Sequence, residues 1–103
     1  MNIFIREKLG GSELLAQLAE ETAELNKAAL KLRRVMDGKN PTPVTLVAAF
    51  ENFEEEIADV LLCLDVMGYD LKELSRYKAI MDGKRERWVR RLQAIERSES
   101  DGL

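Results

Sequence analysis

The spacing of apolar residues in the first part of the chain predicts a long helix. Apolar positions recur there at alternating steps of four and three residues, which marks one packed face of a helix. This line of residues, which we call the first seam, consists of Leu14, Leu18, Glu21, Leu25, Ala28, Leu32 and Val35. We expect a helix over Glu13–Met36, with Ser12 as its N-cap and Gly38 close to its end. Residues 1–11 would then be an N-terminal extension.

A second helix is predicted over Pro43–Met67 by the same stepping. Its seam consists of Leu46, Phe50, Phe53, Ile57, Val60, Leu64 and Met67. Thr42 suits an N-cap followed by proline in the first turn, and Gly68 suits the position after the last turn. The short loop Asn40–Pro43 should make the first two helices antiparallel neighbours.

The remaining chain predicts one more helix, running to about Arg97. It would begin at a capping box in Asp70–Glu73 and show an apolar residue at every seventh position. These positions are Leu74, Met81, Trp88 and Ile95. Gly83 is the place where it would bend or split, and residues 98–103 form a polar, frayed tail.

The fold class that follows is all-α, a helical bundle of three main helices. The 103 residues suffice for a single domain, 1–103. A domain of this size buries only part of its apolar surface, so we expect oligomerisation to complete the bundle.

Composition limits the chemistry more than it limits the fold. The chain contains no histidine and one cysteine, Cys63, so His-based catalysis and His/Cys zinc sites are excluded. Oxygen ligands remain, and these suit Mg²⁺, Mn²⁺ or Ca²⁺. The net charge of −3 argues against a nucleic-acid partner. We find no apolar stretch long enough for a signal peptide or membrane span, and therefore expect a cytoplasmic protein without a membrane partner.

Two pairs of carboxylates stand beside the apolar seams. Glu21 lies in the middle of the first seam, and Glu24 lies roughly 60° further round the helix. Glu56 and Asp59 repeat this spacing along the flank of the second seam. Carboxylates beside a core cost several kcal/mol on the order known for buried ions, and a divalent cation would offset that cost. Acid pairs three residues apart also occur by chance on solvated helix faces, which is the alternative interpretation.

These residues also resemble a family. Glu21-Thr22-Ala23-Glu24 and Glu56-Ile57-Ala58-Asp59 are similar to the Glu-x-x-Glu and Glu-x-x-Asp motifs of MazG-like all-α nucleotide pyrophosphohydrolases. Residues 18–25 and 55–61 resemble the surroundings of those motifs, and the stretch containing Lys84, Arg87 and Trp88 resembles a later basic segment. The similarity covers roughly residues 11–93. The sequence gap between the two acid pairs, which contains residues 37–43, is longer than is usual in the family. Ile80 and Lys84 stand where some relatives carry Lys and Asn.

The resemblance implies Mg²⁺-dependent hydrolysis of (deoxy)nucleoside triphosphates to the monophosphate and pyrophosphate, with Mn²⁺ as an alternative ion. It implies that Glu21, Glu24, Glu56 and Asp59 are the metal ligands and catalytic residues. Lys84 and Arg87 would contact the phosphates of the nucleotide substrate, and the protein would be a homodimer or homotetramer.

Two other functions fit the same residues. One is a helical interaction module, in which the seams only mediate assembly. The other is a related pyrophosphohydrolase that acts on a phosphoribosyl nucleotide. Neither the preferred base or sugar nor a general base can be identified from the sequence.

Overall fold

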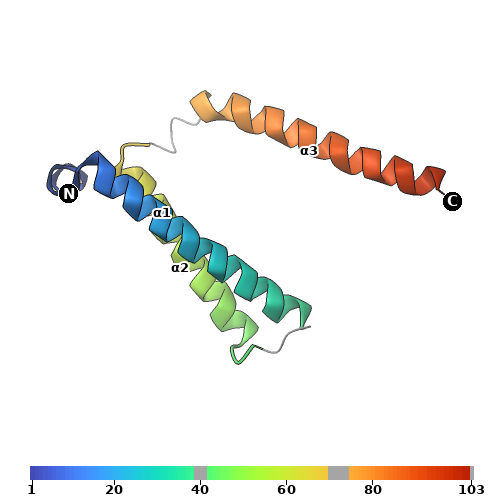
Figure 1. Ribbon diagram of the computed structural model, residues 1–103, viewed down its shortest axis with the longest axis horizontal. Helices are drawn as coiled ribbons and strands as arrows, with labels where there is room; N and C mark the ends of the chain where they lie inside the picture. The colour runs from blue at the N-terminus through green and yellow to red at the C-terminus, as the bar shows by residue number, and fades with distance from the viewer. Residues whose placement is uncertain (39–41, 70–74, 103) are drawn as a thin grey trace. The chain divides into compact units, whose positions relative to one another are not determined.

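The computed structural model describes residues 1–38, 42–69 and 75–102, and all regular structure among them is helical (Figure 1). Helix α1 spans Asn2–Asp37, α2 spans Leu46–Val66 and α3 spans Ser75–Asp101. The chain divides into two units, Met1–Tyr69 with α1 and α2, and Asp70–Leu103 with α3. The all-α prediction is confirmed for the described residues, which contain no strand.

Helix α1 begins at Asn2, well before the predicted start at Glu13, and is interrupted at Gly10. Gly10 has φ 75° and ψ 166°, a backbone conformation open almost only to glycine. The chain is helical on both sides of it, so Ser12 lies inside the helix and is not its cap. The predicted extension is itself helical, and Asn2 Nδ2 donates a hydrogen bond to Asp65 Oδ2 of α2 at 2.9 Å. The N-terminal turns are thereby joined to the end of α2.

Helices α1 and α2 form an antiparallel hairpin, in which they lie side by side along most of α2 (Figure 1). Its core is small and is made by Leu14, Ala28, Leu32, Ala49, Cys63 and Val66. The first seam was predicted correctly, because all seven residues named from the spacing are shielded from solvent. Three of them are buried and four are half-buried. Antiparallel packing of the two helices was also predicted. Part of the loop used to predict it, residues 39–41, lies outside the described residues.

The buried face of α2 agrees with the predicted seam except at its N-terminal end. Five predicted members are half-buried, namely Phe53, Ile57, Val60, Leu64 and Met67. Leu46 and Phe50 are 53% and 49% exposed, whereas Ala49 and Cys63 are only 3% and 8% exposed. Small side chains at the contact allow the two helix axes to approach closely, so Ala49 faces α1 in place of the bulkier Phe50. The observed face therefore steps through Ala49, Phe53, Glu56, Val60, Cys63 and Met67. Glu56 is a member of this face and not merely its neighbour.

The ends of α2 are fixed by local hydrogen bonds. The N-cap is Thr45, whose side-chain oxygen accepts from the Ala48 backbone N at 3.1 Å. The predicted Thr42–Pro43 start was therefore three residues early. At the other end the prediction is confirmed, because Gly68 has φ 93° and the Tyr69 N–H bonds the Leu64 carbonyl at 3.0 Å. This is the Schellman arrangement that glycine favours.

Helix α3 is continuous and longer than predicted. Gly83 keeps helical backbone angles, and the helix continues past Arg97 to Asp101, so residues 98–101 are helical and not frayed. The predicted capping box at Asp70–Glu73 and Leu74 lie outside the described residues. No described residue of α3 is buried.

Candidate metal centre

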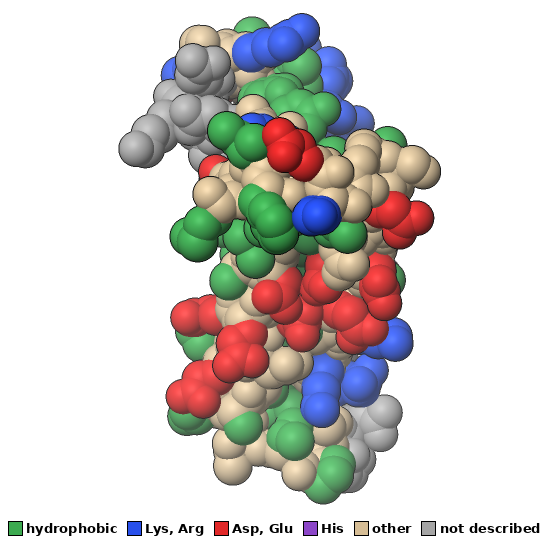
Figure 2. Space-filling view, turned by 90° about the vertical axis from the view of Figure 1, so that its left-hand side faces the viewer, with side chains coloured by type: hydrophobic (Ala, Val, Ile, Leu, Met, Phe, Trp, Pro, Cys, Tyr) green, Lys and Arg blue, Asp and Glu red, His purple; other side chains and the backbone are tan. Residues whose placement is uncertain are grey.

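Three carboxylates converge between the two helices of the hairpin. Glu21 of α1 and Glu56 and Asp59 of α2 each offer a carboxylate oxygen, and these three atoms lie within 4.8 Å of one another. Glu21 and Glu56 are half-buried, whereas Asp59 is exposed. We call these three residues the acidic cluster. In the view of Figure 2, acidic side chains gather on one face of the molecule.

The hairpin brings the cluster together because the packed faces of both helices contain a glutamate. Glu21 occupies a seam position of α1 between Leu18 and Leu25, and Glu56 occupies the corresponding kind of position in α2. When the two seams pack, these two side chains meet across the interface. Asp59 lies one turn after Glu56 on the same side of α2, at the solvent edge. The cluster is thus open to water on one side and bounded by the core on the other.

Electrostatic repulsion within the cluster shows in the pKa of Glu56. Partial burial raises this pKa above its ordinary value, since desolvation disfavours the charged form. The nearby carboxylates of Asp59, Glu21, Glu24 and Glu55 raise it further, in that order. No described basic side chain forms an ion pair with a member of the cluster. A bound cation would remove this repulsion.

Cys63 lies beneath the cluster and remains a thiol. It is buried on the core face of α2, one turn after Asp59. Burial raises its pKa, and the negative charges of Glu21 and Asp59 raise it further. A raised pKa keeps the nucleophilic thiolate scarce, so Cys63 serves as a small core residue that permits close packing.

Glu24 is the predicted ligand that the structure leaves outside the cluster. Its side chain is 49% exposed, and Lys27 Nζ lies 3.7 Å from Glu24 Oε1. An exposed pair of this kind contributes little to stability. Glu24 is nevertheless close enough to raise the pKa of Glu56. The structure therefore places Glu24 at the rim, while the other three predicted ligands converge.

Gln17 contacts the acidic cluster, and the sequence analysis did not identify it. Its Nε2 donates a hydrogen bond to Glu21 Oε1 at 2.8 Å, from one turn earlier on α1. This bond fixes the direction of the Glu21 carboxylate and leaves its second oxygen available. The spacing of four residues was the available signal, because such pairs face each other on a helix.

The two predicted phosphate contacts lie on α3, in the second unit. Lys84 and Arg87 line a shallow depression on this helix together with Trp88 and Arg91. All four side chains are exposed. The depression combines three cations with one aromatic ring, a combination that suits an anionic ligand. Their role toward a substrate stays a prediction.

The donors of the acidic cluster fit a hard divalent cation. All three are carboxylate oxygens, the ligand type that Mg²⁺, Mn²⁺ and Ca²⁺ prefer. The cluster could hold such an ion, with water completing the coordination on the exposed side of Asp59. Among the described residues, no helix is long and apolar enough to cross a membrane. Comparison with protein-family models, curated proteins and solved structures found no match for this chain.

Proposed function

We propose that this protein is a cytoplasmic, metal-dependent nucleotide pyrophosphohydrolase of the MazG-like kind. One observation carries the proposal: two carboxylate pairs with a spacing of three residues face each other across a helical hairpin, and three of the four side chains converge within 4.8 Å. Carboxylates gathered beside a core repel one another, and a bound divalent cation would offset that repulsion. The proposed reaction hydrolyses a (deoxy)nucleoside triphosphate to the monophosphate and pyrophosphate.

In this proposal the acidic cluster is the place that would hold the cation. Bound Mg²⁺ or Mn²⁺ supplies Lewis-acid activation of water and neutralises phosphate charge. Glu21, Glu56 and Asp59 hold the cation, and Gln17 orients Glu21. Glu24, at the rim, would be the fourth ligand that the resemblance implies. The resemblance implies that Lys84 and Arg87 would contact the outer phosphate oxygens of the substrate.

The proposal includes a homodimer or homotetramer. Six large apolar residues of α3 are at least 46% exposed, namely Ile80, Met81, Trp88, Val89, Leu92 and Ile95. Contiguous apolar surface of this kind marks an interaction site. A helix without any buried residue also gains little tertiary stabilisation, and isolated helices are marginal in water.

The same exposed surface supports the second candidate, a helical interaction module without catalysis. Under this alternative the acidic cluster is a solvated feature with no affinity for a cation, and the apolar surfaces carry the function. A phosphoribosyl-nucleotide pyrophosphohydrolase is a variant of the first proposal, since it uses the same cluster. Profiling hydrolysis over nucleoside triphosphates and phosphoribosyl nucleotides separates the two enzymes.

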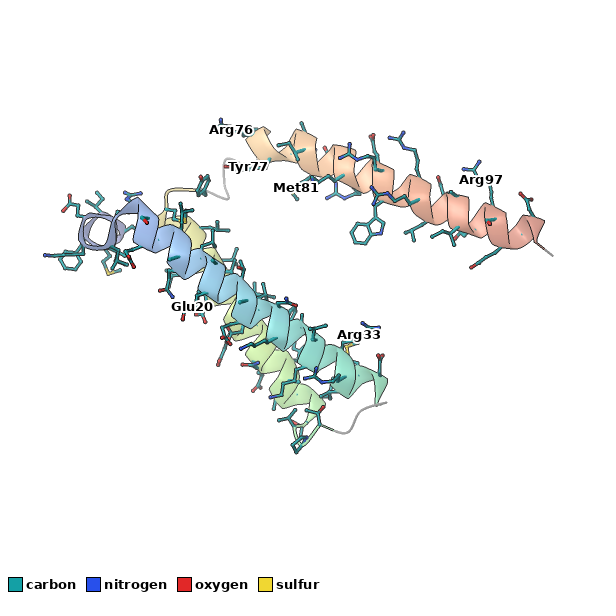
Figure 3. All side chains as sticks on the ribbon, viewed as in Figure 1. Glu20, Arg33, Arg76, Tyr77, Met81 and Arg97 are labelled. Atoms are coloured by element: carbon teal, nitrogen blue, oxygen red, sulfur yellow. The ribbon has the colours of Figure 1, made fainter. Side chains whose placement is uncertain are left out.

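Pyrophosphate release in the presence of Mg²⁺ tests the proposal, with Glu21→Gln compared to Glu20→Gln. Glu20 is exposed and outside the cluster (Figure 3), so it is a control of identical chemistry at the neighbouring position. We expect Glu21→Gln to lower the rate about 100-fold or more, because a ligand charge supplies several kcal/mol. Glu20→Gln should retain full activity.

The thermal stability of the metal-free protein is a second measurement to be made on the same variants. Glu21→Gln removes one of the repelling charges, while its amide oxygen can still accept the hydrogen bond from Gln17. Its melting temperature should therefore equal or exceed that of the parent. A destabilised but fully active Glu21→Gln protein would overturn the proposed metal centre.

A further inference from the structure

The part of α1 that follows the acidic cluster carries cations on the same side of the helix as Glu24. At roughly 100° per residue, Lys27 and Lys31 fall on the flank of α1 that carries Glu24, whereas Arg33 falls on the opposite flank. In Figure 2, Lys and Arg side chains lie next to the acidic ones, toward the C-terminal end of α1. Helix α2 contains neither Lys nor Arg, so these cations belong to α1. Acids and cations thus follow one another along a single face of the hairpin.

Lys31 is half-buried and forms no ion pair with any described residue. A half-buried lysine covers apolar surface with its stem and keeps its ammonium group at the edge, in water. Side chains of a helix are tilted toward its N-terminus, so Lys31 leans toward the acidic cluster and away from the loop. It therefore presents an unpaired positive charge on the cluster's side of α1.

Lys27 lies between Lys31 and the cluster and has only a weak partner. Its Nζ is 3.7 Å from Glu24 Oε1, and the two side chains are 76% and 49% exposed. An exposed pair of this kind is easily exchanged for another partner. If Glu24 turns toward a bound cation, Lys27 becomes available to an anion beside it.

Neither lysine neutralises the acidic cluster itself. The pKa of Glu56 is raised by partial burial and by four neighbouring carboxylates, and no cation acts against them. Lys31 stands roughly 15 Å beyond Glu21 along the helix axis, at about 1.5 Å per residue, and its side chain leans back over only part of that distance. A ligand that contacts both the cluster's cation and Lys31 must carry negative charge at several points along its length. A linear chain of phosphates meets that requirement, and a single phosphate does not.

We infer that Lys31, assisted by Lys27, binds the distal phosphate groups of a linear polyphosphate ligand whose nearest phosphate contacts the cation at the acidic cluster. This role rests on the proposed function, because it needs a cation held by the cluster. It adds a direction to that function: the phosphate chain lies along α1, from Glu21 toward the C-terminal end of the helix. Both cations belong to the hairpin, so the hairpin would bind the phosphate chain with its own residues.

Binding of inorganic tripolyphosphate to the full chain in excess Mg²⁺, measured by isothermal titration calorimetry, tests the role of Lys31. Lys31→Met removes the charge and keeps an apolar stem, and it should weaken binding about tenfold or more, the size of one lost charge-assisted hydrogen bond. Lys31→Arg keeps the charge and should bind nearly as the parent does. Arg33→Met is the matched control, because it removes the same charge on the opposite flank, where Arg33 has only an exposed ion pair with Asp37 at 3.7 Å.

Titration of the same proteins with Mn²⁺ alone separates this role from the metal centre. Lys31→Met should bind Mn²⁺ at least as tightly as the parent, since a nearby positive charge is gone, and this result also shows that the variant is folded. A parent that binds no Mn²⁺ would reject the proposed metal centre and the role of Lys31 together. A parent that binds Mn²⁺ but no tripolyphosphate, or binds tripolyphosphate no better than Lys31→Met does, would overturn the role of Lys31 alone. Equal weakening by Lys31→Met and Arg33→Met would reveal general charge attraction and overturn it as well.

Orthophosphate in excess Mg²⁺ tests the direction of the chain. One phosphate on the cation does not extend to Lys31, so Lys31→Met should bind orthophosphate as the parent does while losing affinity for tripolyphosphate. The same fold-loss of affinity for both ligands would place the Lys31 ammonium group at the cluster itself, and would overturn the assignment of Lys31 to the distal phosphates.

Discussion

The hairpin and α3 both carry charged residues inside an apolar seam, but they do so with opposite signs and in opposite environments. In the hairpin, Glu21 and Glu56 occupy seam positions that are packed and half-buried, and their charges meet. In α3, Lys84 and Arg91 lie between the predicted apolar positions and are exposed. A charge within a seam therefore has two meanings. Where the packed faces of two helices both contain acids, the charges repel one another, and the cluster they form could hold a cation. Where the helix face is exposed, as for the described residues of α3, water solvates the charges.

The largest difference between the two regions should appear in core substitutions. Leu32→Ala in the hairpin removes a side chain that is 9% exposed, and we expect it to lower the free energy of unfolding by about 2–4 kcal/mol. Leu92→Ala in α3, where the side chain is 53% exposed, should cost less than about 1 kcal/mol in dilute protein. Urea unfolding followed by circular dichroism measures both. Equal costs would mean that α3 is packed as tightly as the hairpin.

A smaller effect is expected at the start of α2. Thr45→Ala removes the side-chain oxygen that caps the Ala48 N–H, and should lower stability by about 1 kcal/mol. Thr42→Ala is the matched control, because Thr42 was the cap predicted from the sequence. The same urea experiment decides between the two residues. A larger loss from Thr42→Ala would restore the predicted start of the helix.

The smallest effect concerns pH and the raised pKa of Glu56. A carboxyl group whose pKa is raised in the folded state holds its proton more tightly there than in the unfolded chain. Its contribution to stability is present at pH below about 4.5, its ordinary pKa, and is lost as pH rises through the folded value. The metal-free parent should therefore lose stability over this range relative to Glu56→Gln. If the melting temperatures of the parent and of Glu56→Gln change with pH in the same way, the raised pKa of Glu56 would be contradicted.

The sequence predicted the first seam completely, and with it the position of Glu21, because leucine and alanine spacing defines a single narrow face. For the second seam the prediction was right at five of seven positions and wrong at Leu46 and Phe50, because α2 is apolar over a broader arc. Phe50 and Ala49 then compete for the buried face, and the choice depends on how closely α1 approaches. The buried face therefore also includes Ala49, Cys63 and Glu56, which the prediction had placed on its flank or left out.

The candidate site was predicted to the level of the acid pairs, but not of each side chain. Spacing shows that Glu24 lies roughly 60° from Glu21, and this angle fits both a converging ligand and a rim residue. Lys27, three residues later, offers Glu24 a local partner that spacing rules cannot weigh against a metal. Gln17 escaped notice because a polar residue one turn before a glutamate is common on solvated helices. Which side chains converge is decided only when two helices are placed together.

Direct binding of a divalent cation tests the central claim about the acidic cluster. Titration of the metal-free protein with Mn²⁺, followed by the electron paramagnetic resonance signal of free Mn²⁺, measures occupancy, and competition with Mg²⁺ extends the result to that ion. We predict saturable binding to the parent and to Glu20→Gln, and binding at least tenfold weaker for Glu21→Gln and Glu56→Gln. Absence of binding to the parent, or equal binding by all four proteins, would contradict a metal centre at Glu21, Glu56 and Asp59.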